Sequence, residues 1–507
     1  MYWFGGGAAD TGKEQKAGRT ACRIRFCVSR NQRAGKLSRV YCYSGQIRAI
    51  IADVNGKDYV RCVVMLYTDR DLKKLIVPLV FEQLLAILVG MVDTVMISVC
   101  GEAAVSGVSL VDTVNILMIN VFGALANGGA VVAGHFLGQK NKEDAGKAAW
   151  QLMLFSFLSS IGVMILYLCI HTWVLGTVFG SIEADVYSNA KSYLLITAVS
   201  IPPLAVYNGA AALFRAEGNS KVTMLISILM NSLNIIGNYI LIYVIPMGTA
   251  GAAISTTFSR IAAGIVGFVL IYYNKKDISL KGKLTWRLNG AYVKKILYIG
   301  LPNSLESSMF QLGKIVLMSL ISTLGTSAIT ANAVAGSITN INIIPGMAIN
   351  MALLSVASYC VGAGDREQVK YYTKKIIKLA YLSLGIVSVI IFALVRYVLL
   401  IYHLTPETHE LTTEIIRYHA IMTVLIWVPS FSLPNTLRAA GDVMYPMVTS
   451  IISMWICRIG FAYLFTYLGL GVMGVWIAMT LDWALRAVLY IVRYKKGKWQ
   501  KFFLTSS

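Results

Sequence analysis

Long apolar segments alternate with short polar connections along most of this chain. Twelve such segments begin near residues 75, 104, 148, 188, 222, 251, 296, 328, 375, 413, 444 and 473. A helix of about 20 mostly apolar residues crosses the hydrocarbon layer of a bilayer. A helix also satisfies its backbone hydrogen bonds internally, which lipid cannot do for it. The pattern therefore predicts an all-α integral membrane protein with twelve transmembrane helices.

A sequence repeat relates the two halves of the chain. "LIVPLVFEQL" and "YIGLPNSLES" both place Glu four residues after Pro, at an offset of 224. Three further pairs follow in the same order at 224 or 223: "HFLGQKNKED" with "YCVGAGDREQ", "LFRAEGNS" with "TLRAAGDV", and "MGTAGAAISTT" with "LGVMGVWIAMT". Each repeat holds an even number of helices, so both copies enter the membrane with the same orientation. We expect two six-helix bundles related by an internal parallel repeat, with a cleft between them.

These patterns divide the chain into five parts. We expect a basic cytoplasmic tail, a first bundle, a cytoplasmic linker, a second bundle and a cytoplasmic tail at 1–70, 71–275, 276–292, 293–495 and 496–507. The first tail has no apolar run long enough for a signal peptide. Its cysteines fit no common zinc pattern, so we predict a disordered segment. Alternatively, translation starts at Met65 and the preceding stretch is a mis-called start.

Composition and charge support the membrane assignment and give an orientation. Hydrophobic residues make up 57% of the chain, charged residues 14%, and the mean hydropathy is +0.66, which excludes an ordinary soluble protein. Lys and Arg gather in alternate connections and the C-terminal end, whereas the other connections hold only Lys191 and Arg396. Because basic loops stay in the cytoplasm, we expect a multi-pass cell-membrane protein with both termini cytoplasmic. The net charge of +21 thus reflects topology, and nucleic acid is not an expected partner.

Ionisable residues inside the predicted helices are the candidates for chemistry. A charge at mid-bilayer costs about 2.5 to 3.5 kcal/mol, so it needs a partner, a proton or a wet cavity. Asp93 is the single charge in "LLAILVGMVDTVMIS", and it lies about 20° round the helix from Glu82. It could exchange a proton or supply an oxygen ligand to Na⁺. Satisfaction by a neighbouring hydroxyl or amide is the structural alternative, which we favour less.

Amides and a hydroxyl complete the candidate cation site in the first bundle. Asn231, Asn234 and Asn238 form one stripe in "NSLNIIGNYILIY", which must face protein or water. Helix-packing hydrogen bonds and a cation site shared with Asp93 explain the stripe equally well. The candidate cation-binding set is Asp93, Asn234, Asn238 and Thr256.

The second bundle has its own polar candidates, Glu306, Lys314 and Arg458. Glu306 could line the bundle or neutralise Lys314, eight residues further on. Asp482 and Arg486 are four residues apart, acid first, which predicts a structural ion pair within one helix.

The residues that carry these patterns also resemble a known family. "GMVDTVMIS" followed by "GEAAVSGVSL", "GHFLGQKNKEDA", "LFRAEGNSK" and "LRAAGDVMYP" is similar to the multidrug and toxic compound extrusion (MATE) family of bacterial type. The resemblance implies a twelve-helix antiporter that expels cationic and amphipathic organic compounds in exchange for H⁺ or Na⁺. Asp93 matches the family's first-helix acid, which contributes to the cation site.

Two departures from the family pattern bear on coupling. Many relatives carry Asn and, four residues later, Asp in the fifth helix, where this chain has Asn234 and Asn238. Relatives with a cation site in the second bundle carry an acid near the position of Phe310 and another in the tenth helix, which has none here. The resemblance therefore leaves H⁺ and Na⁺ coupling open, with Asp93 as the best single candidate.

We expect a secondary antiporter that works by alternating access, and not an enzyme. No GxxxxGK[ST] segment is present, so ATP drive is unsupported, and no cofactor is expected. The expected partners are small organic cations, H⁺ or Na⁺ and the lipid bilayer, and a monomer is expected. A lipid-linked saccharide flippase remains open, because Lys314, Arg458 and Arg260 would suit a cationic cleft. A membrane receptor is the third class, but the connections hold no output domain.

Overall fold

The computed structural model describes residues 47–54, 57–173, 175–176, 183–402 and 404–503. The chain divides into two compact units, Met1–Asp69 and Arg70–Ser507.

The first unit contains a β-hairpin. Strand β1 (Ile47–Val54) pairs antiparallel with β2 (Lys57–Val64), with Val54 opposite Lys57. The chain between them reads Asn-Gly, the dipeptide that most strongly favours two-residue hairpin connections. The expectation of a disordered segment did not take account of this local signal, and the extent of the tail stays a prediction. Its remainder, 1–46, lies outside the described residues, and a translation start at Met65 stays a prediction.

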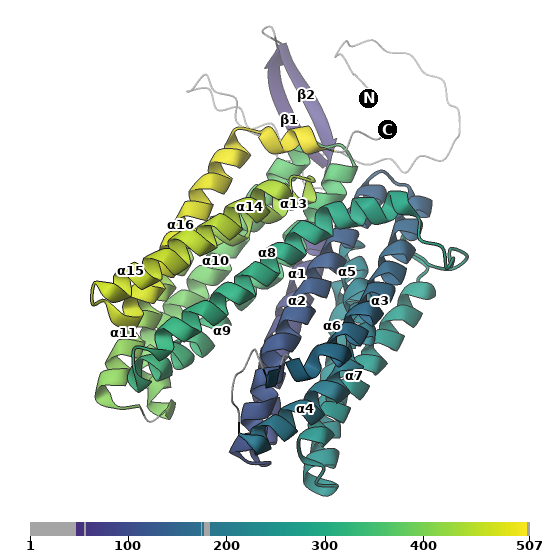
Figure 1. Ribbon diagram of the computed structural model, residues 1–507. Coiled ribbons are helices and arrows are strands. Elements are labelled where there is room, and N and C mark those ends of the chain that lie inside the picture. The colour runs from purple at the N-terminus through teal and green to yellow at the C-terminus, as the bar shows by residue number, and fades with distance from the viewer. Residues whose placement is uncertain (1–46, 55–56, 174, 177–182, 403, 504–507) are drawn as a thin grey trace, which may run out of the picture. The chain divides into compact units, whose positions relative to one another are not determined.

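The second unit is helical (Figure 1). Among the described residues, its first half contains seven α-helices and the π-helical segment η2. These are α1 (Asp69–Ser98), α2 (Glu102–Gly138), α3 (Lys142–Trp173), α4 (Ala184–Ala198), α5 (Ile201–Ala216), α6 (Ser220–Asn238), the π-helical η2 (Tyr239–Val244) and α7 (Gly248–Tyr272).

The second half lies beside the first and is green to yellow in Figure 1. It comprises α8 (Gly290–Ser322), α9 (Thr326–Gly362), α10 (Arg366–Leu399), η3 (Leu400–Tyr402), α11 (Pro406–Met422), η4 (Thr423–Trp427), α12 (Val428–Phe431), α13 (Leu433–Ala439), α14 (Met444–Ser453), η5 (Met454–Gly460), α15 (Phe461–Tyr467), α16 (Gly471–Lys495) and η6 (Lys498–Phe502). Of these, η4 and η5 are π-helical, and η3 and η6 are 3₁₀ segments.

The helices match the predicted membrane segments. Within the described ranges, ten helical segments are long and apolar enough to cross a bilayer, and α4 with α5, bent by 52°, forms an eleventh. Helix α8 has 33 residues and occupies the place of the seventh predicted segment, but its charges make it less apolar. The all-helical membrane fold with two repeated halves is thus confirmed.

Several helices begin well before their apolar segment because polar residues cap them. Helix α10 begins at Arg366, nine residues before the start that the apolar pattern suggests. The side chain of Asp365 there accepts a hydrogen bond from the backbone N–H of Gln368 at 3.0 Å. Such a cap satisfies an N–H that the first helical turn leaves unpaired. Hydropathy alone therefore marks the part of the helix that lies in lipid, and not its ends.

Glycines bring the two halves into contact along α2. Gly128 lies against the backbone of Gly300 in α8. A Cβ on Gly138 would overlap the carbonyl oxygen of Tyr359 in α9, and a Cβ on Gly362 would overlap that of His135. These last two contacts are equivalent by the repeat, since each residue of one contact lies 224 positions from its counterpart in the other. The ends of α2 and α9 therefore meet in a symmetric backbone contact.

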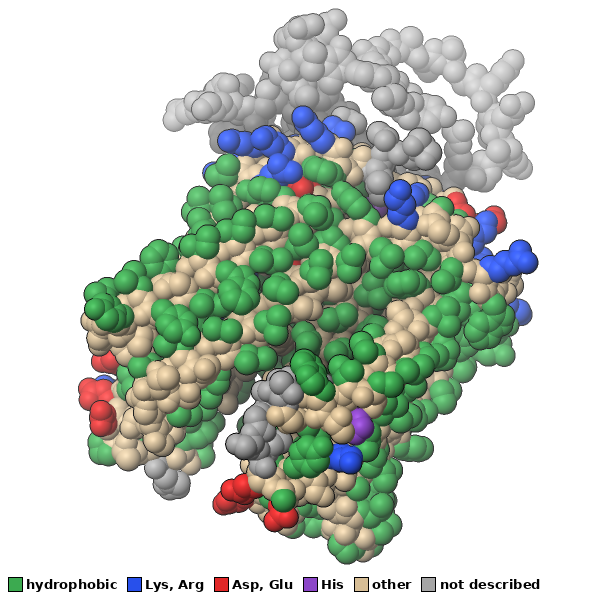
Figure 2. Space-filling view, in the orientation of Figure 1, with side chains coloured by type: hydrophobic (Ala, Val, Ile, Leu, Met, Phe, Trp, Pro, Cys, Tyr) green, Lys and Arg blue, Asp and Glu red, His purple; other side chains and the backbone are tan. Residues whose placement is uncertain are grey.

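Charge is unevenly distributed over the helical unit. Hydrophobic side chains cover its flank, and Lys and Arg gather at the end where α2 and α9 meet (Figure 2). Figure 2 also shows the two halves standing apart at the opposite end. The unit thus has an apolar band, one basic end at which the halves touch, and one end at which they separate.

Candidate functional site

Asp93 is held by an amide from another helix of the first half. It lies in α1 and is half-buried, and the side-chain amide of Asn238 in α6 donates a hydrogen bond to its Oδ1. Among the described residues Asp93 forms no ion pair. Asp112 of α2 and Arg260 of α7 lie near enough to act on its charge. The guanidinium of Arg260 donates to Ser200 Oγ at 2.8 Å and ion-pairs with no described carboxylate.

The other two candidates of the first half form the neighbouring contact. The amide nitrogen of Asn234 donates to Thr256 Oγ1 at 3.1 Å. Gly237 leaves no room for a Cβ beside Ser255, so α6 and α7 approach closely at this level. Asn231, the third member of the stripe, instead donates to Ser227 Oγ at 3.3 Å. Thus Asn238 reaches Asp93, and Asn234 and Thr256 bond to each other one turn away.

The oxygen atoms of Asp93, Asn238 and Thr256 suit a small hard cation better than a transition metal. The Oδ1 atom of Asn238 is buried and accepts no hydrogen bond from a described residue. Carboxylate, amide and hydroxyl oxygens are ligands that hard cations prefer. The described part of the chain holds no cluster of three or more His, Cys, Asp or Glu that could bind a metal ion. A bound cation here would depend on one carboxylate and neutral oxygens.

Asp112 is a second acid in this layer that our residue set did not include. It accepts hydrogen bonds from Asn115 and from the Tyr193 hydroxyl, each at 3.4 Å. The positive charge of one guanidinium group, that of Arg260, therefore acts on both the Asp93 and the Asp112 carboxylate. The sequence offered one signal, because Asp112 and Arg260 are both charges inside apolar segments with no local partner.

A cavity of about 830 Å³ lies in the second half. It is enclosed by α8, α9, η5, α16 and the segment from α11 to α13, with Ala124 and Asn127 contributed by α2. All three second-bundle candidates, Glu306, Lys314 and Arg458, line it, whereas none of the first-half candidates does. Its other lining residues are largely apolar and aromatic, including Phe310, Trp427, Phe431, Trp476 and Trp483. Such a lining is typical of sites for organic molecules.

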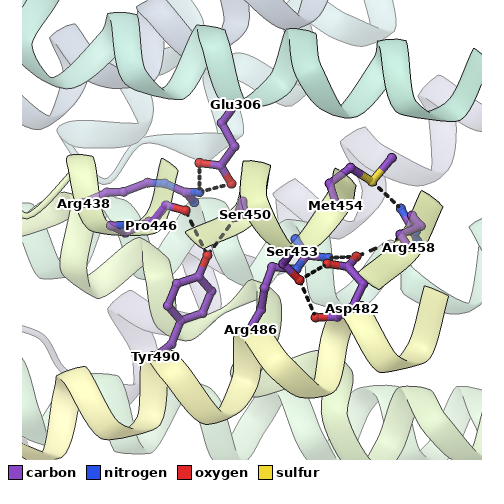
Figure 3. A network of polar contacts seen from close by, with 10 residues as sticks. All are labelled: Glu306, Arg438, Pro446, Ser450, Ser453, Met454, Arg458, Asp482, Arg486 and Tyr490. Carbon is purple, nitrogen blue, oxygen red and sulfur yellow. Dashed lines mark hydrogen bonds and ion pairs between the residues drawn. The ribbon is translucent and has the colours of Figure 1, made fainter. Parts of the chain in front are cut away.

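Glu306 is neutralised by Arg438 (Figure 3). Nη2 of Arg438 donates to both carboxylate oxygens of Glu306 at 2.7 Å. The partner of Glu306 in the described structure is thus Arg438, in the last turn of α13, and not Lys314. The first half contains the equivalent pair, with Arg215 Nη1 at 3.7 Å from Glu82 and Thr223 donating to Glu82 at 2.7 Å.

Asp482 is shared by two arginines. Arg486 Nη2 donates to Asp482 Oδ2 at 2.7 Å, which confirms the predicted ion pair within α16. Arg458 Nε lies at 3.7 Å from the same oxygen, and Ser453 also donates to this carboxylate (Figure 3). Asp482 is fully buried and does not line the cavity.

Lys314 and Arg458 face the same aromatic ring. The Lys314 ammonium lies 5.3 Å and the Arg458 guanidinium 4.9 Å from the centre of Phe310. Arg458 is carried by the π-helical turn η5, a distortion that is frequent at functional sites. Gly313 permits this approach, because a Cβ there would overlap the side chain of Met454. Lys314 forms no ion pair with any residue of the described ranges.

Two repeated halves of membrane helices, an acid inside an apolar helix and a cavity lined by aromatic residues define a membrane transporter of the doubled-bundle class. The chain belongs to the MatE family, whose model matches residues 78–240 and 302–464, once in each half. Both matches begin at the repeated prolines. This is a family of transporters and not of enzymes.

The chain is similar to curated relatives over most of its length. It is 26% identical over 441 residues to "Probable multidrug resistance protein NorM" of Thermotoga maritima, with 85% of this chain and 93% of that protein covered. It is 26% identical over 432 residues to "Uncharacterized transporter YisQ" of Bacillus subtilis, with 83% and 93% covered.

Solved structures share the fold. "Crystal structure of MATE in the bent conformation" gives a TM-score of 0.79 at 20% identity, covering 86% of this chain and 97% of that one. "Outward-facing conformation of a multidrug resistance MATE family transporter of the MOP superfamily" gives 0.78 at 20%, covering 85% and 96%. A structure from Pyrococcus furiosus, titled "Reverse polarity of binding pocket suggests different function of a MOP superfamily transporter", gives 0.79 at 20%, covering 86% and 97%.

Proposed function

We propose that this protein exports amphipathic organic compounds by cation-coupled antiport, and that Asp93 is the site of the coupling ion. The observation that carries the proposal is the setting of Asp93. It is a carboxylate in an apolar helix, it accepts one amide hydrogen bond, and it has no cationic partner among the described residues. Such a group gains stability by binding H⁺ or Na⁺.

The names of relatives support the transport direction. The Thermotoga maritima relative and one of the similar structures are both named for multidrug resistance. The second-half cavity, with its aromatic lining, has the volume and chemistry of a site for an organic compound. Export of such compounds is therefore the activity that best fits both the relatives and the cavity.

Alternating access would be driven by unequal binding of the ion to two conformations. With the basic end cytoplasmic, as the distribution of Lys and Arg favours, the contact of Gly138 and Gly362 closes the inner side. Opening inward would separate these glycines and close the halves at the other end. An ion at Asp93 couples the two processes if it binds one conformation more tightly than the other.

The two coupling ions would use Asp93 differently. A proton would neutralise the carboxylate and need no further ligand. Na⁺ would keep the charge and would need oxygens from several directions, for which Asn238 Oδ1 and the hydroxyl of Thr256 are the nearest candidates. Imposing a proton gradient and a sodium gradient separately on the same vesicles distinguishes the two.

The test is gradient-driven transport of a fluorescent amphipathic compound into inside-out vesicles. We expect Asp93→Asn to abolish the dependence on the gradient, because the amide cannot bind a proton or balance the charge of Na⁺. Asp185→Asn is the matched control, since it makes the same change at an exposed position of α4. Transport by Asp93→Asn that still follows the gradient would remove Asp93 from the mechanism.

The flippase alternative retains one supporting observation, the unpaired Lys314 next to Arg458 in the cavity. Phosphate groups of a lipid-linked saccharide would suit these cations.

A further inference from the structure

We propose that the second-half cavity takes an amphipathic organic anion, with its acidic group between Lys314 and Arg458 and its apolar body against the aromatic wall. The inference rests on the proposed transport function and names the substrate class of that function. This inference assigns an organic anion to the cavity, whereas the family resemblance implied an organic cation.

The charges around the cavity do not balance. Four basic side chains, Lys314, Arg438, Arg458 and Arg486, are accompanied by two acids, Glu306 and Asp482. Glu306 is the acid that lines the cavity, and both its oxygens accept from Arg438 at 2.7 Å. Asp482 lies behind the wall and binds Arg486 more closely than Arg458. A surplus of two positive charges therefore remains in this group.

The surplus is concentrated at one place. Lys314 and Arg458 lie within 5.3 Å of the centre of the same Phe310 ring. The π face attracts each cation, but the two like charges repel each other in surroundings less polar than water. An anion that binds to both cations would relieve this repulsion.

Arg458 also has hydrogen-bonding capacity to offer. Its residue is only 4% exposed; its Nε lies 3.7 Å from Asp482, and its Nη1 donates to the thioether sulfur of Met454 at 3.8 Å. A thioether is a weak acceptor, so an anionic oxygen that accepts from this guanidinium in its place gains the difference. The guanidinium group suits carboxylate, sulfonate and phosphate oxygens in particular.

The rest of the ligand would meet aromatic side chains. Trp427 and Phe431 stack at 5.0 Å between ring centres, and Phe431 meets Trp483 edge-on at 5.6 Å. Both tryptophans and Phe431 line the cavity. An aromatic or aliphatic body attached to the acidic group would be buried against this wall.

An organic cation fits this cavity less well. It would approach Lys314, which has no ion pair among the described residues, and Arg458, which shares Asp482 with Arg486. Glu306, the acid in the described lining, is already paired with Arg438. Like charges across a binding surface disfavour the wrong partner strongly. The cavity therefore selects against the substrate charge that the family resemblance implied.

Substrate charge also determines how transport responds to the membrane potential. Exchange of one entering H⁺ or Na⁺ for one exported monovalent anion moves two positive charges inward. Exchange for one exported monovalent cation moves none. An inside-negative potential thus accelerates the first exchange and leaves the second unchanged.

The first experiment compares two probes of matched shape on the purified full chain, naphthalene-2-sulfonate and 2-naphthyltrimethylammonium, by titration calorimetry. We expect the sulfonate to bind at least about tenfold more tightly. This comparison needs no variant. Tighter binding of the ammonium probe would overturn the proposal.

Variants of Lys314 then locate the anion. Removing one charged hydrogen-bonding partner should weaken sulfonate binding about tenfold in Lys314→Gln, whereas Lys314→Arg keeps the charge and most of the affinity. Lys294→Gln is the control, because it makes the same change in the same helix outside this cavity. Equal affinity of Lys314→Gln and the unaltered protein would overturn the placement.

A second experiment distinguishes a soluble anion from an anionic lipid. Proteoliposomes under a potassium diffusion potential are assayed for movement of naphthalene-2-sulfonate and, separately, of a fluorescent phosphatidic acid between leaflets. Acceleration of either by an inside-negative potential supports an anionic substrate and identifies its source. If neither moves while the ammonium probe does, the inference is wrong.

Failure of this inference can be told from failure of the coupling proposal. Equilibrium binding in calorimetry requires no gradient, so the sulfonate titration of the unaltered protein tests the anion site whether or not Asp93 couples transport to an ion. Sulfonate binding by the unaltered protein together with gradient-independent transport by Asp93→Asn supports both proposals. Gradient-driven sulfonate transport by Asp93→Asn would end the coupling proposal and leave the anion site intact.

Discussion

The two halves share a scaffold, but their polar and charged side chains lie at different positions of the repeat. At the offset of 224, Leu317 stands where Asp93 stands, and Lys314 stands where the first half has Gly90. At the offset of 223, Cys457 takes the place of Asn234. The first half thus carries an acid and an amide where the second half carries Leu and Cys, and the second half carries a Lys where the first half has a glycine. A duplicated fold can therefore hold a small-cation site in one copy and an organic-ligand cavity in the other.

What the halves retain in common is their frame. Glu82 with Arg215 and Glu306 with Arg438 are equivalent ion pairs, which join α1 to α5 in the first half and α8 to α13 in the second. The paired glycines at the ends of α2 and α9 obey the same symmetry. Because these features recur in both copies, we assign them to the architecture, and the unmatched charges to function.

Removal of an ion pair that both halves share should have the largest effect on stability. Arg438→Met leaves the Glu306 carboxylate, whose side chain is only 15% exposed, without its partner, which should lower the free energy of unfolding by about 3 kcal/mol. Arg215→Met should cost less, because its Nη1 lies at 3.7 Å from Glu82 and Thr223 still donates to that acid. Denaturant titration in mixed micelles measures both.

The double variant Glu306→Gln with Arg438→Met is the control for this comparison. It removes both charges together and should recover much of the loss. Equal losses for Arg438→Met and Arg215→Met would show that the two pairs contribute equally, contrary to their geometry.

The second effect concerns the symmetric contact of α2 and α9. Gly138→Ala or Gly362→Ala introduces a Cβ against a backbone oxygen, which cannot move aside as a side chain can. Overpacking costs about 1 to 3 kcal/mol, so we expect the closed state to be about ten to a hundred times less populated. Reactivity of an introduced cysteine at this end reports the opening.

Symmetry sharpens this prediction, because the two alanine variants should behave alike. Gly162→Ala in α3 is the control, since a Cβ there meets nothing within 4 Å. An effect of Gly138→Ala without one of Gly362→Ala would mean that the halves do not close as equivalents.

Local sequence patterns predicted much of the fold but only part of the site. The apolar segments mark the membrane spans because a helix that crosses lipid must be largely apolar. The sequence repeat marks the symmetry of the two halves. The pair of Asp482 and Arg486 was predictable because the two are one helical turn apart. Asp93 was identifiable as a charge among apolar residues. These are features in which the neighbours along the chain decide the outcome.

Contacts between distant segments were less accessible. Glu306 and Arg438 are 132 residues apart, so no pattern of neighbouring residues links them. The repeat held the missing signal, since the Glu and the Arg recur together in both halves. The cavity in the second half, and the meeting of Lys314 and Arg458 at Phe310, depend on packing that no local pattern reports.

The ion site of the first half can be strengthened by one substitution. Asn238→Asp adds a carboxylate beside Asp93, as many relatives are expected to have at this position. Since cation affinity rises with the number of charged ligands, we expect Na⁺ to bind about tenfold more tightly. Calorimetry with Na⁺ at high pH measures this change, and Asp93→Asn on the same background should reverse it. No gain in affinity would place Asn238 outside the ion site.

The smallest effect tests whether Thr256 contributes an oxygen or only supports Asn234. Thr256→Val keeps the shape and removes the hydroxyl that accepts from Asn234 at 3.1 Å. The loss of one neutral hydrogen bond costs about 1 kcal/mol, which corresponds to about a fivefold weaker apparent affinity for the coupling ion. Transport measured against ion concentration gives this affinity, and the unfolding free energy separates it from a loss of stability. If stability falls while ion affinity is unchanged, Thr256 acts only on Asn234, and the comparison of the halves then rests on Asp93 and Asn238. The second half carries Met479 at the equivalent position, so a weakened ion affinity would add Thr256 to the residues that distinguish the two copies.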